Sequence, residues 1–123
     1  MWLPTTAHIL RLHEMLIERT GGLQGVRDIG LIESALHRAS AAYRDYERYP
    51  SVEDKASVVC CGLIGNHGFV DGNKRIGIAA MLLILEKNGV PMNYTQQDLI
   101  DLGLAIAQDH MQDISEWIVE HKI

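Results

Sequence analysis

The stretch NKRIGIAAMLLILEKNG, residues 73–89, decides the fold. It opens with two cations, and from Ile76 to Leu85 it is apolar on every side of a helix. A helix without a polar face has to be surrounded by other elements, so this one is predicted to be the central helix of the molecule. Gly89, which has no side chain, suits the left-handed turn that closes many helices.

Five further segments carry apolar residues at helical spacing, and each has a start signal. The signals are Pro4 as a first helical residue, then Asp28, Ser51 with Asp54, Thr95 with Asp98, and Asp113. We therefore expect an all-α fold, a compact bundle of about six helices around a buried central helix. Residues 90–94 are expected to be briefly extended.

Size and charge limit the function classes. With 123 residues, 47% of them hydrophobic, and no linker or repeat, the chain is predicted to be a single domain over residues 1–123. A net charge of −5 without a basic stripe argues against direct nucleic-acid binding. The stretch from Ile76 to Leu85 is only about half as long as a membrane span, and the amino terminus has no export signal. We expect a cytoplasmic protein.

Cysteines and histidines give no sign of a metal cluster. In a cytoplasmic protein, the adjacent Cys60 and Cys61 are expected to be buried thiols that act as small hydrophobes. The histidines lack zinc-site spacing, because His13-Glu14 is not followed by the second histidine of an HExxH pattern. The Walker-A and GxGxxG phosphate-binding patterns are absent as well.

The start of the central helix has an electrostatic conflict. A helix amino terminus is partly positive, so Lys74 and Arg75 there each cost on the order of 0.3 to 1 kcal/mol. A bound phosphate chain would offset that cost, with both cations and the free amides after Gly72 directed at it. Gly72 would let phosphate approach the backbone, and Asn73 would either cap the helix or fix the loop.

Two residues beside this anion site suggest chemistry. Asp71 places a carboxylate next to the expected phosphates, an arrangement that Mg²⁺ would reconcile. His67 could accept a proton from an attacking hydroxyl, because a neutral imidazole is a good base at cytoplasmic pH. Taken singly, each residue has a simpler interpretation: Asn73 as a helix cap after a turn, His67 as a structural histidine, and Asp71 as a solvated turn residue.

The run HGFVDGNKR, residues 67–75, resembles the signature of the Fic family, His-x-Phe-x-Asp/Glu-Gly-Asn-Gly/Lys-Arg, and specifically its death-on-curing (Doc) toxin branch. Further likeness lies in Leu12-His13, in residues 21–28, in residues 30–36 and in residues 85–89. The resemblance implies a small all-α Fic fold that binds ATP with Mg²⁺ and modifies a protein hydroxyl.

The resemblance also assigns roles by matching positions. His67 would be the general base, Asp71 the Mg²⁺ ligand, and Phe69 the anchor of the loop in the core. Gly72, Asn73, Lys74 and Arg75 would bind the nucleotide phosphates. The glycine-rich segment would be the flap that docks the target by backbone pairing. It comprises Gly22, Leu23, Gln24, Gly25, Val26, Arg27 and Asp28, and is expected to be exposed and mobile.

Departures from the adenylyl-transferring members favour a kinase. Lys74 stands where those enzymes have glycine, and Ile78 where they have a second arginine. The resemblance then implies transfer of the γ-phosphate of ATP to a Ser or Thr of a translation factor, elongation factor Tu being the expected target. Adenylyl transfer and a silent nucleotide- or antitoxin-binding module remain alternatives, the latter because Gly68, where proline is common, would loosen the placement of His67.

An antitoxin is the expected partner. Some Fic proteins carry an inhibitory Ser/Thr-x-x-x-Glu helix, and this sequence has no such pattern. Restraint would then come from another chain, expected to be a disordered segment that folds into a helix on an apolar groove. Tyr43, Tyr46 and Tyr49 are candidates for that contact surface, or ordinary rim packing.

Overall fold

The computed structural model describes residues 1–43, 46–107 and 113–123, with the side chains at 42, 43 and 46 left out. The elements in chain order are α1 (Thr6–Thr20), α2 (Ile29–Arg38), β1 (Ala42–Tyr43), β2 (Tyr46–Glu47), α3 (Val52–Asn66), α4 (Asn73–Lys87), α5 (Gln96–Ala107) and α6 (Asp113–His121). The predicted all-α bundle is confirmed, with one small antiparallel hairpin that pairs Ala42 with Glu47. In the described residues no helix is both long and apolar enough to cross a bilayer.

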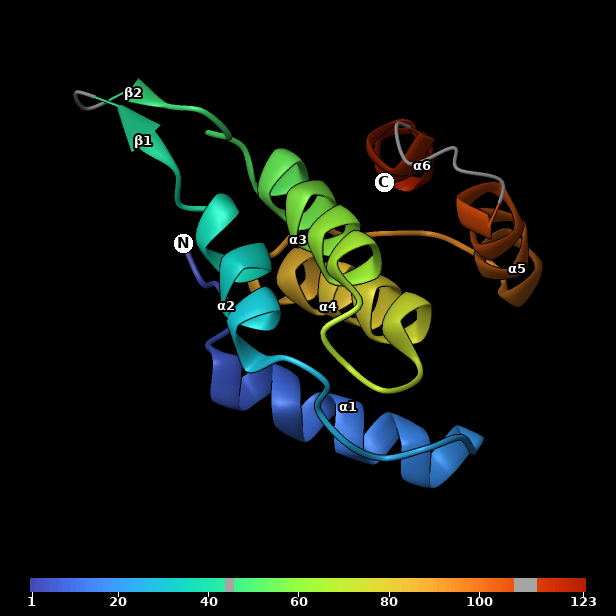
Figure 1. Cartoon of the computed structure of the whole chain (residues 1–123). Helices are drawn as coiled ribbons and strands as arrows, with labels where there is room; N and C mark the ends of the chain where they lie inside the picture. The colour runs from blue at the N-terminus through green and yellow to red at the C-terminus, as the bar shows by residue number, and fades with distance from the viewer. Residues whose placement is uncertain (44–45, 108–112) are drawn as a thin grey trace.

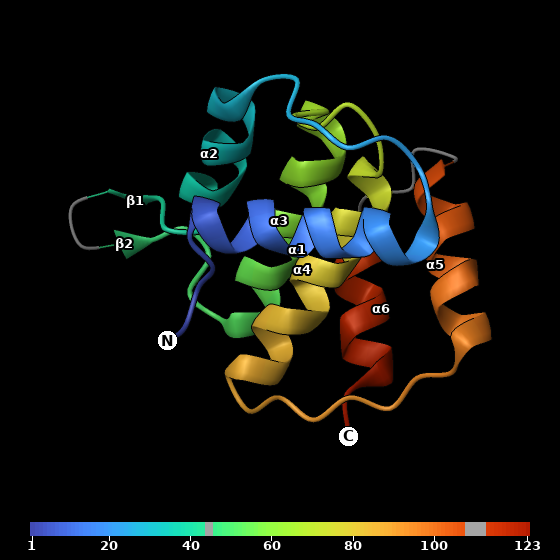
Figure 2. The same cartoon turned by 90° about the horizontal axis from the view of Figure 1, so that it is seen from below.

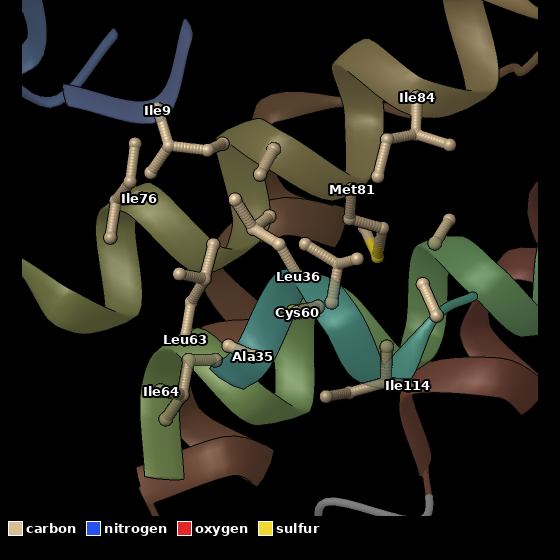
Figure 3. Packing of buried hydrophobic residues seen from close by; sticks show 14 of the residues in the cluster. Ile9, Ala35, Leu36, Cys60, Leu63, Ile64, Ile76, Met81, Ile84 and Ile114 are labelled. Atoms are coloured by element: carbon tan, nitrogen blue, oxygen red, sulfur yellow. The ribbon is translucent and has the colours of Figure 1, made fainter. Parts of the chain in front are cut away.

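Helices α3 and α4 form the middle of the bundle (Figures 1 and 2). Helix α4 packs against α3 on one side and α1 on another, while α3 also contacts α2 and α6. Ile76, Ala80, Met81, Ile84 and Leu85 of α4 are buried, as predicted from its apolar stretch. The centre of the bundle is therefore formed by α4 together with α3, whose residues in the buried cluster are visible in Figure 3.

Most predicted helix starts are confirmed by side-chain caps. The Asp28 carboxylate accepts from the Gly30 N–H, and the Ser51 hydroxyl accepts from the Asp54 N–H. Thr95 and Asp98 form a reciprocal capping box. Gly89 has the expected left-handed conformation, with φ of 71°, just after α4.

The predicted start of α1 is wrong by two residues. Thr5, not Pro4, precedes the first turn as its N-cap. Its hydroxyl accepts from the His8 N–H, and the His8 Nδ1 accepts in return from the Thr5 N–H. This capping box satisfies the Thr5 and His8 amides, two of the four that the first turn of α1 leaves without an intrahelical acceptor.

The remaining segments agree with expectation where they are described. Met92 pairs with Lys122 in an extended segment, and the Asn93 N–H donates to the His121 carbonyl at 2.7 Å. Cys60 is a fully buried free thiol whose pKa is raised by burial, and Cys61 is partly buried. The side chains of Tyr43 and Tyr46, and His110, lie outside the described part of the chain.

Candidate functional site

The site is built on the short loop that joins α3 to α4. Its ends are two left-handed residues, His67 with φ of 50° and Gly72 with φ of 73°. Among the described residues His67 is the only non-glycine residue with positive φ. Such backbone strain persists where the surroundings hold it, and it is frequent at functional sites. The loop is therefore a fixed structure.

Asn73 closes this loop. Its side-chain oxygen accepts from the Phe69 N–H and its side-chain nitrogen donates to the Phe69 carbonyl, each at 3.0 Å. Phe69 itself is 2% exposed, so its side chain lies in the core, as expected of an anchor for the loop. Of the two roles that the sequence left open for Asn73, the structure shows loop closure, since α4 begins without a side-chain cap at Gly72. Phosphate contact by Asn73 stays a prediction.

Asp71 lies beside the start of α4, with its side chain 40% exposed. Its Oδ2 accepts from the Leu23 N–H at 3.0 Å, and its Oδ1 accepts from the Gly72 N–H at 2.8 Å. These amide donors, Leu23 first, and then the nearby charge of Arg75 hold the pKa of the Asp71 carboxyl below its usual value. The carboxylate is thus ionised and available as an oxygen ligand at neutral pH.

Lys74 and Arg75 bind different parts of the protein in this structure, and their contacts with phosphate stay a prediction. The Arg75 guanidinium donates to the Thr20 hydroxyl and to the Gly21 carbonyl at 2.6 Å, both at the end of α1. The Lys74 ammonium donates to the Gly103 carbonyl of α5 at 3.3 Å. The carboxyl-terminal end of α1 is partly negative, so without a ligand it offsets the charge of Arg75.

A pocket of about 320 Å³ nevertheless brings most of the predicted residues together. It is lined by His67, Val70, Asp71, Gly72, Asn73, Lys74 and Arg75. His67 is exposed there, and no other described residue forms a hydrogen bond with its imidazole. The arrangement puts an imidazole, a carboxylate and two cations around one solvent-accessible space.

The glycine-rich flap, residues 22–28, is exposed as predicted, but it is tied to the motif along its length. Arg27 and Asp28 donate their N–H groups to the Gly68 carbonyl, and the Gly25 carbonyl accepts from the Val70 N–H. The Arg27 guanidinium also binds the last carbonyls of α3, at Asn66 and His67. The backbone groups along one edge of the flap are therefore already hydrogen-bonded to the motif.

The opposite edge of the flap carries backbone groups that are not used in this way. Val26 faces Phe69 in an antiparallel bridge whose hydrogen bonds run through the residues on either side, Gly25 and Arg27. In such a bridge the N–H and C=O of the central residue point away from the partner strand. The backbone donor and acceptor of Val26 thus point away from the motif.

Gly68 is held firmly. It is buried, its carbonyl accepts two flap amides, and a Cβ built on it would lie 2.5 Å from Ile32 Cγ1 of α2. A larger residue at this position would require the Ile32 side chain or its backbone to shift. The concern that Gly68 loosens the placement of His67 finds no support in these contacts.

Sequence reasoning assigned no role to His13. This α1 residue is 3% exposed, its Nε2 lies 2.7 Å from the Asp71 carbonyl oxygen, and its ring stacks on Phe69 with centroids 3.8 Å apart. The available signal was its spacing: Ile9, His13 and Ile17 recur every four residues and form the buried face of α1.

The donor set around the pocket fits Mg²⁺ only in company with phosphate. In the described part of the chain no three His, Cys, Asp or Glu side chains are grouped closely enough to hold a metal. Asp71 offers one ionised carboxylate, which is the protein share that Mg²⁺ commonly takes when phosphate oxygens and water complete its octahedron.

Comparison with known proteins identifies the family of the chain. The model of the Fic/DOC family matches residues 3–85, and the chain belongs to the Fic/Doc family. It is 36% identical to "Toxin Doc" of Mycolicibacterium smegmatis over 95 residues, 77% of this chain and 68% of that protein. It is 31% identical to "Protein kinase doc" of Escherichia phage P1 over 99 residues, 80% of this chain and 77% of that protein.

Proposed function

We propose that this protein is the toxin of a toxin–antitoxin system and acts as a protein kinase. It would transfer the γ-phosphate of ATP to a Ser or Thr hydroxyl of a translation factor, with elongation factor Tu as the expected target, and so block translation. The observation that carries the proposal is the shared pocket of His67, Asp71, Lys74 and Arg75 at the amino end of α4. The names of the two Doc relatives support it.

In this proposal the oxygen of the target hydroxyl attacks the γ-phosphorus, the bond from that phosphorus to the bridging β–γ oxygen breaks, and ADP leaves. The hydroxyl proton passes to the imidazole of His67. The chain itself supplies positioning and charge: the free amides at the start of α4, the Lys74 ammonium and the Arg75 guanidinium would bind the phosphates. The outer edge of the flap at Val26 would hold the target segment extended.

Mg²⁺, held by Asp71 together with phosphate oxygens, would neutralise charge on the nucleotide. Arg75 has to leave Thr20 and Gly21 to bind phosphate, exchanging neutral acceptors for an anionic one. That exchange is favourable because an anionic phosphate adds charge–charge attraction to the hydrogen bonds of the guanidinium and can accept two of them in parallel. The contacts of Arg75 in the ligand-free protein are therefore compatible with a phosphate-binding role.

The kinase reaction is preferred to adenylyl transfer because the second arginine of the adenylyl-transferring members is missing. Ile78 takes its place, partly buried and packed against the core. No positive charge is available there to bind a distal phosphate, while Lys74 adds one next to Arg75. This pattern favours a nucleotide placed with its γ-phosphate toward His67.

Labelled ATP tests the reaction. The purified protein is incubated with elongation factor Tu and ATP carrying label at either the α or the γ position. We expect γ label, and no α label, on the target, and none with a His67→Ala variant. Transfer of α label would establish adenylyl transfer instead. Absence of any transfer, with toxicity of the His67→Ala variant equal to that of the native chain, would favour a silent binding module.

Nucleotide binding is tested separately by thermal stability. A site with a micromolar dissociation constant should stabilise the protein by about 4 kcal/mol at a thousandfold excess of Mg-ATP. We expect a smaller shift for Lys74→Ala. An unchanged melting temperature in the native chain would contradict the nucleotide-binding part of the proposal.

A groove between α1 and α4 supports the antitoxin part. It has a volume of about 310 Å³ and is lined by Trp2, His8, Arg11, Leu12, Met15, Leu83 and Lys87. Its lining combines four apolar side chains, Trp2, Leu12, Met15 and Leu83, with the cations Arg11 and Lys87, which would suit an amphipathic helix with acidic flanks. We expect Leu12→Asp to abolish rescue of cell growth by a co-expressed antitoxin while leaving toxicity intact; full rescue would exclude this groove.

A further inference from the structure

His13 occupies a position that an apolar residue would be expected to fill. It is one of only two buried polar or charged side chains in the described part of the chain, the other being Lys55. Its neighbours on the inward face of α1 are Ile9 and Ile17, one turn away on each side. Burying an imidazole in such a face is costly unless its polar atoms find partners. The partner of His13 therefore indicates why it is there.

That partner is the main chain of the motif. The Asp71 carbonyl can only accept, so His13 Nε2, 2.7 Å away, carries the hydrogen and donates it. The same ring lies nearly parallel to that of Phe69, with an interplanar angle of 13°. The His13 side chain of α1 thus contacts the loop at two points, the Phe69 ring and the Asp71 carbonyl.

The Asp71 carbonyl that His13 binds belongs to the same residue as the carboxylate that lines the pocket. The Asp71 side chain is oriented in turn by the amides of Leu23 and Gly72, and Gly72 lies so close that a Cβ built on it would be 3.5 Å from His13 Nε2. A displaced Asp71 main chain would move the carboxylate and the Gly72 amide together. Loop closure by Asn73 acts only at Phe69, so it does not replace this contact.

We propose that His13 is a positioning residue: its Nε2–H holds the main chain of Asp71 so that the carboxylate and the Gly72 amide face the pocket. The metal-binding consequence rests on the proposed function, whereas the placement of the loop does not. His13 does not touch the reacting atoms in this scheme, and it acts through Asp71.

Two substitutions separate the donor from the ring. His13→Phe keeps an aromatic ring to stack on Phe69 but cannot donate to the Asp71 carbonyl, whereas His13→Gln keeps an amide donor and loses the ring. Ile114→Val, in the core of α6, serves as a matched control for a general loss of stability. Circular dichroism verifies the fold of each variant.

The first readout is amide hydrogen exchange in the ligand-free protein. In His13→Phe we expect the Leu23 and Gly72 amides, which are bonded to the Asp71 carboxylate, to exchange about tenfold faster than in the native chain, relative to amides in the middle of α3. His13→Gln should restore most of the protection, and Ile114→Val should leave this ratio unchanged. Unchanged protection in His13→Phe, or an equal loss in Ile114→Val, would overturn the proposal.

The second readout is the gain in ATP affinity that Mg²⁺ provides, measured by calorimetry. We expect that gain to fall about tenfold in His13→Phe and to recover in His13→Gln. An unchanged gain in His13→Phe would contradict the proposal. If the native chain binds no Mg-ATP at all, the proposed function fails, and the exchange measurement still decides the role of His13.

Discussion

At the scale of single residues, the side chains of Asp71, Asn73, Lys74 and Arg75 in the motif all have partners within the protein, whereas the His67 imidazole has none among the described residues. Asn73 forms hydrogen bonds with Phe69, and Asp71 accepts hydrogen bonds from Leu23 and Gly72. Arg75 donates hydrogen bonds to the end of α1. The residues expected to bind ligand therefore also maintain the local structure. Substitutions in the motif should be judged by stability as well as by activity.

Asn73→Asp tests the loop-closing role of the amide. The new carboxylate can still accept from the Phe69 N–H, but it faces the Phe69 carbonyl with a second acceptor. We expect the free energy of unfolding at neutral pH to fall by about 1 to 3 kcal/mol, with part of the loss recovered when the carboxyl is protonated. Urea denaturation at two pH values measures this.

Asn93→Asp is the matched control for that experiment. Asn93 is exposed, and its hydrogen bond to the His121 carbonyl runs through its backbone N–H. Its substitution should change the unfolding free energy by no more than about 0.5 kcal/mol. Similar losses in both variants would show that added charge, not the broken contact with Phe69, is responsible.

At the scale of helices, the close packing of α3 against α4 depends on Gly77. A Cβ at this position would lie 2.7 Å from Ile64 Cγ1 and 3.0 Å from the Cys60 carbonyl oxygen. We expect Gly77→Ala to lower the free energy of unfolding by about 1 to 3 kcal/mol through overpacking. Thermal or urea denaturation measures the loss.

Gly103, in the middle of α5, is the matched control for Gly77. Among the described residues outside its own stretch of α5, no atom lies within 4 Å of a Cβ built there, so Gly103→Ala should instead stabilise the protein by about 0.5 to 1 kcal/mol through helix propensity. The same substitution is thus expected to have opposite signs in the two helices. A gain in stability at Gly77 would show that α3 and α4 can move apart.

The cap of α5 gives a pH dependence. The Thr95 N–H, the largest cause, lowers the pKa of the Asp98 carboxyl in the folded chain below its ordinary value of 3.8. A carboxyl with a lowered folded pKa contributes stability above its unfolded pKa, and this contribution is lost as pH falls through the folded value. We expect Asp98→Asn to flatten the fall in stability between about pH 5 and pH 2.

Chemical denaturation across that range measures the slope, and Glu33→Gln on the exposed surface of α2 is the comparison. The glutamine variant should retain the native pH dependence. A slope unchanged in Asp98→Asn would mean that this cap contributes nothing to acid sensitivity.

Helix starts and ends were predictable because their signals are local. Asp28, Ser51 and Thr95 cap helices through residues two or three positions away. The start at Pro4 was wrong because a histidine can close a capping box in place of the usual Glu or Gln, and that pairing of Thr5 with His8 is an uncommon pattern. The central position of α4 followed from its composition alone.

At the scale of the whole molecule, the contacts between distant segments could not be read from the sequence. His13 and Asp71 are 58 positions apart, and Arg75 and Gly21 are 54 apart. Composition and motif spacing identify which residues gather at the start of α4, but they do not give the side-chain partners in the ligand-free chain. The partners of Lys74 and Arg75 were missed for this reason.

Asp71 and Arg75 line the pocket and also bind residues 20–23. A ligand in the pocket should therefore change the amide exchange of that segment. Binding of a non-hydrolysable Mg-ATP analogue is expected to withdraw both side chains from residues 20–23 and to accelerate exchange of the Leu23 amide. The Arg27 and Val70 amides, whose acceptors are backbone carbonyls, should remain protected. Uniform exchange behaviour along the flap would contradict this separation.

A kinetic consequence follows from the contact between Asp71 Oδ2 and the Leu23 N–H. In the proposed kinase reaction this oxygen would leave the Leu23 amide to take part in Mg-ATP binding, so we expect the nucleotide to bind first and the polypeptide second. Initial-velocity measurements would then give an ordered bireactant pattern, in which a dead-end peptide inhibits uncompetitively against ATP. Drugs that imitate the peptide would in that case gain potency as cellular ATP rises.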